Sequence, residues 1–369
     1  MEDETIWPGV TISSRIKFLD GLRGIAILAV VIWHAYGSTY ANNLPFGNNY
    51  SVPPIRFFWV GVQLFFMISG FVILMTLERC KNFTEFAIRR WLRLFPAMLI
   101  ASLLIFSFDI LTGLGPNAHR TAIDLLPGLI FVSPSLIHFL TRVMIVSLDD
   151  PFWSLYVEVC FYVLFGSAYF LFGSKKAIVA IFAIFMISVM SNLLAGYVDK
   201  QSIFARIAAA MDWLGFIHFG WFVGGALLYR YFMTNDRRIL WLAISVAVLS
   251  VLSSEIFKYG LADRIALGSA AALAIGSMLS RRIQIVLATP FFVTLGFISY
   301  PLYLIHCNMV VGLTQFISEK NPAMPLATTP LIPIFAVSCV SFVIATLEPE
   351  LRSVLSNIFS SIARRHRGA

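Results

Sequence analysis

The chain has 369 residues, of which 59% are hydrophobic and only 12% are charged. A soluble domain carries roughly 45–50% apolar and roughly 25% charged residues, and it could not keep this much apolar surface away from water. The composition therefore excludes soluble, disordered and disulfide-stapled proteins and predicts a protein of the lipid bilayer. The net charge of +8 comes from basic residues scattered between apolar runs. That distribution is typical of the cytoplasmic loops of membrane proteins and not of nucleic-acid binding.

Apolar runs of about 20 residues, the length that crosses a bilayer, recur along the chain. We predict an all-α integral membrane protein with about ten transmembrane helices in a single domain, residues 1–369. The predicted spans are 22–41, 57–77, 92–112, 152–173, 177–197, 213–232, 239–254, 264–280, 290–312 and 330–349. The apolar stretch 125–140 is broken by Pro127, Gly128 and Pro134, and we predict an interfacial or re-entrant piece there.

The basic residues between these spans predict the orientation of the chain. With the N-terminus in the cytoplasm, the inside segments carry 19 Lys and Arg residues and the outside segments carry 8. Cytoplasmic loops are enriched in Lys and Arg, so this split favours an N-in, C-in topology. A missed or extra span would invert every later loop and remove the asymmetry.

Polar side chains inside spans are costly, so each one is a hypothesis for function. Arg23 and His34 lie about three helical turns apart on one face of the first span, separated by about 16 Å. This face offers an anion site at its cytoplasmic end and a titratable imidazole deep in the membrane. The alternative is a snorkelling arginine with a histidine that bonds a neighbouring carbonyl.

Three more guanidinium groups, those of Arg89, Arg90 and Arg93, lie at the predicted inner face before the third span. Arg90 and Arg93 are i, i+3 neighbours on one helix face. Guanidinium groups make forked contacts with phosphate, so the cluster predicts a site for an anionic ligand. Ordinary enrichment of basic residues on the inside is the alternative.

The fourth span carries a polar stripe. Asp150 precedes a proline and predicts the helix N-cap. Ser154, Glu158 and Tyr162 follow four residues apart on one face, and the helix rise places Glu158 at a height similar to that of His34. A hydrogen-bonding anchor between helices is the alternative.

The ninth span carries a second stripe, in which Ser299, Tyr303 and His306 follow i, i+4, i+7. Pro301 should kink this helix. His306 is predicted either as a catalytic group or as a structural partner. His218, in the sixth span, is a weaker candidate because its glycine neighbours indicate close helix packing.

These positions predict a cation-rich inner mouth that leads to a histidine–carboxylate pair inside the membrane. Such a layout suits a long anionic donor that enters from the cytoplasm with its reactive end pointing outward. An acyl-coenzyme A has this shape, with phosphates at one end and a thioester at the end of a thin arm.

Five segments, in this order, resemble the motifs of the membrane acyltransferase 3 family. They are FLDGLRG (18–24) with His34, LFFMISGF (64–71), RRWLRLFP (89–96), WSLYVE (153–158) and SYPLYLIH (299–306). The resemblance implies a multi-pass enzyme of the bacterial inner membrane. Such an enzyme moves an acyl group, usually acetyl, from cytoplasmic acyl-coenzyme A to a hydroxyl of a glycan, a lipid-linked glycan or another glycoconjugate. Many relatives have a second carboxylate where this chain has Val159.

On this hypothesis His34 acts as general base and Glu158 orients its imidazole and stabilises its charge. The phosphates of the donor would be held by Arg23, Arg89, Arg90 and Arg93. The acceptor site would be formed or supported by Ser69, Trp153, Ser154, Tyr300, Tyr303 and His306. We expect no metal and no tightly bound cofactor. A proton-coupled transporter, with buried His and Glu as relay groups, and a non-catalytic scaffold are the alternatives.

Overall fold

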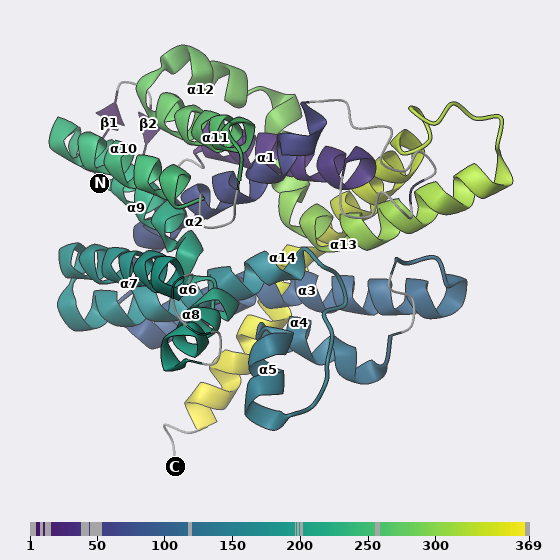
Figure 1. Ribbon diagram of the computed structural model, residues 1–369, viewed down its shortest axis with the longest axis horizontal. Helices are drawn as coiled ribbons and strands as arrows, with labels where there is room; N and C mark the ends of the chain where they lie inside the picture. The colour runs from purple at the N-terminus through teal and green to yellow at the C-terminus, as the bar shows by residue number, and fades with distance from the viewer. Residues whose placement is uncertain are drawn as a thin grey trace.

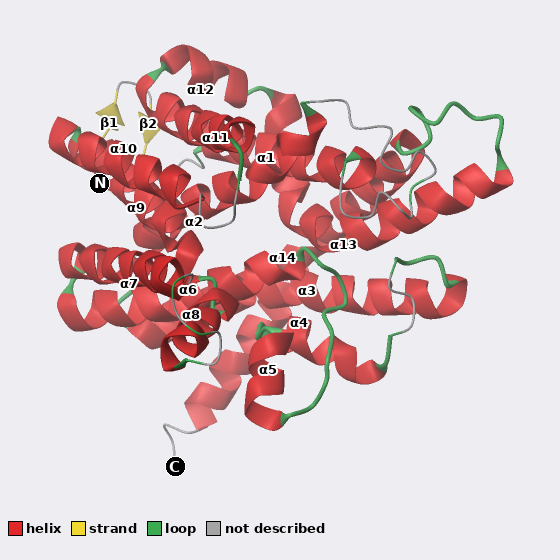
Figure 2. Ribbon diagram, viewed as in Figure 1, coloured by secondary structure: helices red, strands yellow, loops and turns green. Residues whose placement is uncertain are grey.

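The computed structural model describes residues 5–7, 10–11, 16–37, 44, 54–116, 120–195, 197, 199, 202–254 and 259–365. These residues are almost entirely helical, apart from a two-stranded hairpin near the N-terminus (Figures 1 and 2). The strands are β1 (Thr5–Trp7) and β2 (Val10–Thr11). The first helical elements are α1 (Lys17–Tyr36), η2 (Ile55–Val60), α2 (Gly61–Leu77), α3 (Phe83–Thr112), η3 (Ala122–Leu125), α4 (Leu126–Ile130), α5 (Pro134–Thr141), α6 (Phe152–Phe172) and α7 (Ser174–Ala195). The later ones are α8 (Ile203–Trp213), η4 (Phe216–His218), α9 (Phe219–Thr234), α10 (Arg237–Leu252), α11 (Leu261–Leu279), α12 (Arg281–Leu287), α13 (Pro290–Lys320) and α14 (Leu331–Arg365).

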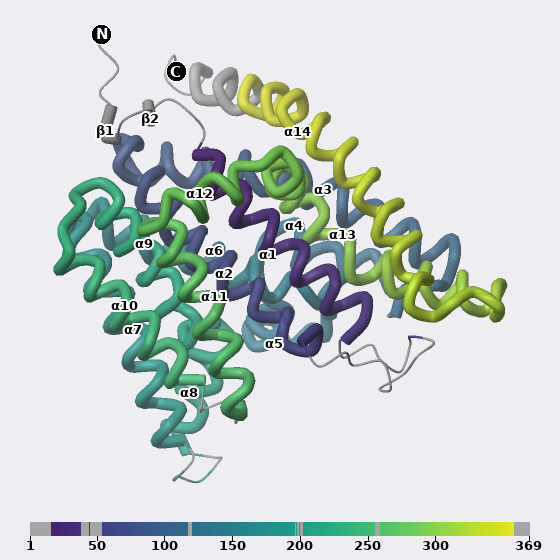
Figure 3. The backbone as a smooth tube through the Cα atoms, turned by 90° about the horizontal axis from the view of Figure 1, so that it is seen from above, coloured from purple at the N-terminus to yellow at the C-terminus, as the bar shows by residue number. Residues whose placement is uncertain are grey.

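Within the described residues, 8 helices are long and apolar enough to cross a membrane, or up to 10 if each of two bent pairs counts as one span. The predicted all-α membrane fold is therefore confirmed. In Figure 3, the coloured part of α14 runs toward the side of the bundle on which α1 begins. That this side faces the cytoplasm rests on the loop charges and stays a prediction.

The structure differs most from the predicted spans in the sixth and the seventh. The sixth span, predicted as 213–232, is a pair of helices, α8 and η4–α9, bent by 62°. Gly215 lies between them with a φ of 70°, a left-handed conformation that ends α8 and suits glycine. The seventh, predicted as 239–254, is α10, whose 16 residues extend about 24 Å and fall short of the hydrocarbon thickness.

Local sequence signals account for the start of α3 and for the bend in residues 122–141. Asn82 caps α3 by accepting a hydrogen bond from the Glu85 amide, so this helix begins well before the predicted span and carries the three arginines in its first turns. Residues 122–141 form two short helical units bent by 108°. This bend fits either a broken span or the predicted re-entrant piece.

Glycine residues let the central helices approach each other closely. A Cβ atom at Gly24 or Gly296 would collide with the backbone of the facing helix of the α1–α13 pair. A Cβ atom at Gly70 or Gly225 would collide with the backbone of the α2–α9 pair. Small residues at such contacts are the usual means by which helices pack in lipid, where no hydrophobic force drives them together.

We expect Gly225→Ala to destabilise the protein, because the new methyl group would meet the carbonyl oxygen of Met67. Overpacking of this kind costs about 1–3 kcal/mol. Gly268→Ala in α11 is the matched control, since a Cβ atom there meets nothing within 4 Å. Thermal unfolding of both variants in detergent checks the prediction, and equal midpoints would contradict it.

Candidate functional site

A cavity of about 90 Å³ lies among α1, α2, α3, α6 and α13. Its charged lining side chains are those of Arg23, Arg90, Arg93 and Glu158. The other lining residues are Val62, Phe65, Phe66, Ile68, Ser69, Leu94, Ser154, Leu155, Tyr162, Ser299, Tyr300 and Tyr303. Polar residues from all five predicted motifs are thus gathered along one space inside the helical bundle.

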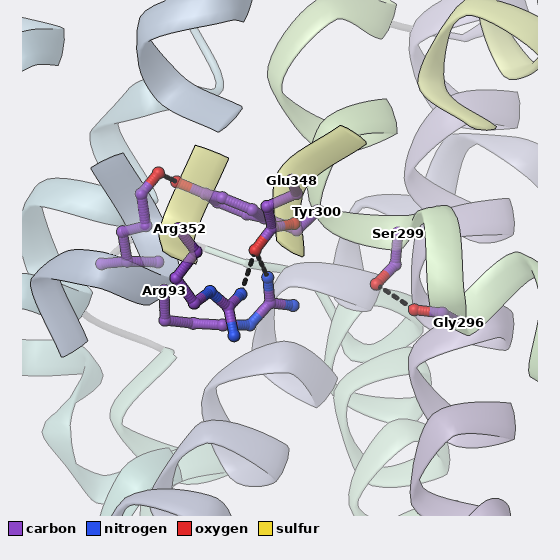
Figure 4. Close-up of polar contacts among 7 residues, drawn as sticks. Arg93, Gly296, Ser299, Tyr300, Glu348 and Arg352 are labelled. Carbon is purple, nitrogen blue, oxygen red and sulfur yellow. Dashed lines mark hydrogen bonds and ion pairs between the residues drawn. The ribbon is translucent and has the colours of Figure 1, made fainter. Parts of the chain in front are cut away.

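The arginines occupy one end of this cavity. Arg90 donates to the Thr76 hydroxyl at 2.9 Å, and Arg23 lies 3.7 Å from the Asp20 carboxylate. The Arg93 guanidinium lies over the ring of Tyr300, 5.5 Å from the ring centre (Figure 4). These three groups form a cationic surface that an anionic ligand could contact.

Arg89 does not belong to this set. Its side chain is 52% exposed and forms an ion pair with Glu85 at 2.6 Å. Arg89 follows Glu85 by one turn on α3 and therefore pairs along its own helix instead of facing the cavity. The prediction that it contributes to the same anion site is not supported by the geometry.

Glu158 lies beside the arginines and not beside His34. Its carboxylate accepts hydrogen bonds from the hydroxyls of Ser69 and Tyr162, both at 2.5 Å. It lines the cavity with Tyr300, at the end where Arg93 lies. The predicted His34–Glu158 pair is therefore wrong. The rise per residue gave the distance of each side chain from the end of its own helix. It did not give the shift of one helix relative to the other along the membrane normal.

The middle of the cavity is marked by a hydroxyl pair. Ser154 and Tyr303 hydrogen-bond at 2.7 Å, and the Tyr303 hydroxyl also donates to the carbonyl of Pro151 at 3.1 Å. Trp153 does not line the cavity. Its side chain is 41% exposed and its ring packs against His218, with 5.2 Å between ring centres.

His34 is paired with His306 across the α1–α13 contact. Nε2 of His306 lies 3.0 Å from Nδ1 of His34, and both residues are buried. The His306 ring centre is 5.7 Å from that of Tyr303, which lines the cavity. The two histidines therefore lie about one helical turn beyond the hydroxyl pair, on the side away from the arginines.

The hydrogen bonds of this pair fix which nitrogen of each neutral ring carries the proton. Nδ1 of His306 lies 3.1 and 2.9 Å from the carbonyl oxygens of Leu302 and Tyr303, so it must be the donor. Its Nε2 is then an acceptor and takes the Nδ1–H of His34, which also lies 3.0 Å from the Val30 carbonyl. Nε2 of His34 is left unprotonated and can accept a proton.

A second cluster of buried polar side chains lies near these histidines and consists of Asn308, Asp109 and Asp149. This cluster was not predicted from the sequence. Asn308 donates its side-chain amide to Asp109 at 3.3 Å and its backbone N–H to Asp149 at 3.2 Å. Burial raises the pKa of Asp149 to about 8. Asp109 lies inside the predicted span 92–112, so the rule that selected Glu158 applied to it as well.

The predicted helix start before the fourth span needs a correction. Helix α6 begins at Phe152, and Pro151 occupies the N-cap position. The carboxylate of Asp149, not that of Asp150, accepts the local backbone hydrogen bond, from the Asp150 N–H at 3.0 Å.

Among the described residues, no group of three or more His, Cys, Asp or Glu side chains could hold a metal ion.

The comparisons with known proteins agree with the motifs. A family model described as an acyltransferase domain matches residues 16–347, nearly the whole chain. No curated protein and no solved structure matches the chain. The match covers the cavity, the arginines and both histidines, and it favours an acyltransferase over the alternative of a transporter. The chain therefore belongs to the acyltransferase 3 family and is a membrane acyltransferase.

Proposed function

We propose that this enzyme moves an acyl group, in the first place acetyl, from acyl-coenzyme A to a hydroxyl of a glycan or glycoconjugate. The donor would enter from the cytoplasm, and the acceptor would lie at the membrane or on its outer side, in the inner membrane of a bacterium. One observation carries the proposal. Three guanidinium groups lie at one end of a cavity whose other end approaches a histidine pair. With its phosphates at the arginines, the donor would direct its thioester arm toward the histidine pair.

His34 would act as the general base. Its unprotonated Nε2 takes the proton of the acceptor hydroxyl as the hydroxyl oxygen attacks the thioester carbonyl carbon. The C–S bond then breaks, the acyl group stays on the acceptor oxygen, and the imidazolium returns the proton to the departing thiolate. The His306 nitrogen and the Val30 carbonyl, which both contact Nδ1 of His34, stabilise the positive charge between these two steps.

Glu158 has a different role in this proposal from the one that the sequence indicated. It holds the hydroxyls of Ser69 and Tyr162 and balances part of the charge of the neighbouring arginines. A buried polar group without partners would be costly. The carboxylate and its two hydroxyls therefore keep the wall of the cavity ordered, whether or not a donor is bound.

The arginine end predicts a defect in donor binding. We expect Arg23→Ala or Arg93→Ala to weaken acetyl-coenzyme A binding about tenfold or more, because one charge-assisted contact is worth roughly 1.5–3 kcal/mol. Arg89→Ala is the matched control and should bind the donor as the parent does, since Arg89 faces Glu85. Calorimetric titration of the purified variants measures the effect. Unchanged affinity in both cavity variants would reject the donor site.

The proposed orientation can be tested separately. With the arginines at the cytoplasmic face, Lys320 at the end of α13 lies outside and Lys175 at the start of α7 lies inside. A membrane-impermeant maleimide added to intact cells should label Lys320→Cys and spare Lys175→Cys, which should react only after lysis. The reverse pattern would invert the topology.

A further inference from the structure

Helix α14 brings a buried carboxylate to the arginine end of the cavity. Glu348 is 5% exposed, and its Oε1 accepts a hydrogen bond from Nη1 of Arg93 at 2.6 Å. The same oxygen accepts a second hydrogen bond, from Nη2 of Arg352, one turn further along α14. Figure 4 shows both guanidinium groups directed at this carboxylate. Neither Glu348 nor Arg352 belongs to a motif of the sequence.

The Arg93 side chain is held from two directions. Glu348 takes one terminal nitrogen, and the Tyr300 ring lies against the guanidinium group. Tyr300 is itself fixed, since its hydroxyl donates to the Leu94 carbonyl at 2.8 Å. Within the described part of the chain, Nη2 and Nε of Arg93 have no hydrogen-bond partner. A guanidinium group with one edge fixed can present its other N–H groups in a defined direction.

The charges around Glu348 agree with a supporting role. A buried carboxylate next to a phosphate site would repel the ligand if its charge were not balanced. Two arginines share this one carboxylate, so the cluster keeps a net positive charge toward the cavity. Arg352 follows Glu348 by four residues, the spacing at which opposite charges pair along a helix.

We infer that Glu348 is a positioning residue for Arg93 and that Arg352 offsets the charge of Glu348, which makes α14 a part of the donor site. This inference rests on the proposed function. Glu348 touches no donor atom in this arrangement. It acts by holding the Arg93 guanidinium where the donor phosphates arrive.

The test is acetyl-coenzyme A affinity of the purified full-length enzyme, measured by calorimetric titration. Glu348→Gln should weaken binding roughly 3- to 10-fold, the range of coupling between residues in contact, although it removes a negative charge near an anion site. The rate at saturating donor should stay at the parent level. Glu348→Asp keeps the charge but withdraws the carboxylate by one methylene, and it should also weaken binding. Parent-like or tighter binding in either variant would overturn the inference.

A double-mutant cycle tests the role of Arg352. Arg352→Gln should weaken binding in the parent and have no further effect in the Glu348→Gln background, because it acts only through that carboxylate. Glu78→Gln is the matched control. Glu78 follows the end of α2 and bonds the Tyr229 hydroxyl at 2.6 Å, so its loss should leave donor affinity unchanged.

Two results separate this inference from the proposed function. If Arg93→Gln lowers donor affinity and Glu348→Gln does not, the donor site stands and the positioning role fails. If the parent binds no acetyl-coenzyme A, or Arg93→Gln binds it as the parent does, the donor site itself fails. Should Glu348→Gln not yield folded protein, Glu348→Asp alone decides the positioning role.

Discussion

Replacing His34 by alanine should abolish acyl transfer and leave acyl-coenzyme A binding intact. The donor phosphates would still meet the three cavity arginines, because these lie at the opposite end of the cavity. The acceptor hydroxyl would lose the only base that we assign to it, and loss of a general base costs on the order of 100-fold or more. Transfer rate and donor affinity, measured on the same preparation in liposomes, check both halves of the expectation.

A matched control for this variant is His218→Ala. His218 is also a histidine inside the bundle, but it packs against the rings of Trp153 and Phe66 and does not belong to the His34–His306 pair. Its replacement should leave the chemical step near the parent rate. The mechanism is wrong if His34→Ala still transfers acyl groups at more than about 1% of the parent rate.

His306→Ala should lower the turnover rate by roughly 10- to 100-fold, by analogy with residues that orient metal-binding histidines, whose removal has an effect of this size. The variant removes the ring acceptor of the His34 Nδ1–H and leaves it only the Val30 carbonyl, so the imidazole is held less firmly in one orientation. His306→Gln restores an acceptor oxygen and should recover part of the rate. Donor affinity should not change in either variant.

The same experiment separates the structural assignment of His306 from the sequence-based one. An acceptor-site histidine would raise the KM for the glycan and spare the rate at saturation. An orienting histidine lowers that rate at every acceptor concentration. A pure KM effect in His306→Ala would return His306 to the acceptor site and remove the histidine pair from the mechanism.

The positions of most helices could be predicted because lipid imposes a strong pattern on the sequence. A bilayer requires runs of about 20 apolar residues, and eight such runs are candidate spans in the structure. The predictions were less accurate where a single residue breaks a run. Gly215 turns the chain between α8 and η4, but a glycine inside an apolar window leaves the mean hydropathy of that window nearly unchanged.

The composition of the site could be predicted better than its pairing. Arg23, Arg90, Arg93 and Glu158 were each identified as charges in apolar surroundings, and they line one cavity. Spacing along one helix, however, says nothing of how far a neighbouring helix is shifted along its axis. His34 therefore meets His306 on α13, while Glu158 on α6 meets Ser69.

Glu348 shows a different limit of the sequence. It lies in the last turn of the predicted span 330–349, where a carboxylate near the membrane surface is ordinary. Only the path of α14 across α3 brings it to Arg93, 255 residues earlier in the chain. A contact over such a separation has no local signal, because neither periodicity nor charge spacing connects the two segments.

The glycine contacts between α1 and α13 have a consequence for the histidine pair. Gly24 lies ten residues before His34, and that length of helix measures about 15 Å. A tilt of α1 by about 4° around this contact would move the His34 ring by about 1 Å, enough to break a hydrogen bond of ordinary length. The hydrogen bond that joins the proposed base to His306 thus depends on how closely two helix backbones touch at the far end of the same pair. A side chain at position 24 would alter the reaction by tilting α1, without contacting the donor, the acceptor or a histidine.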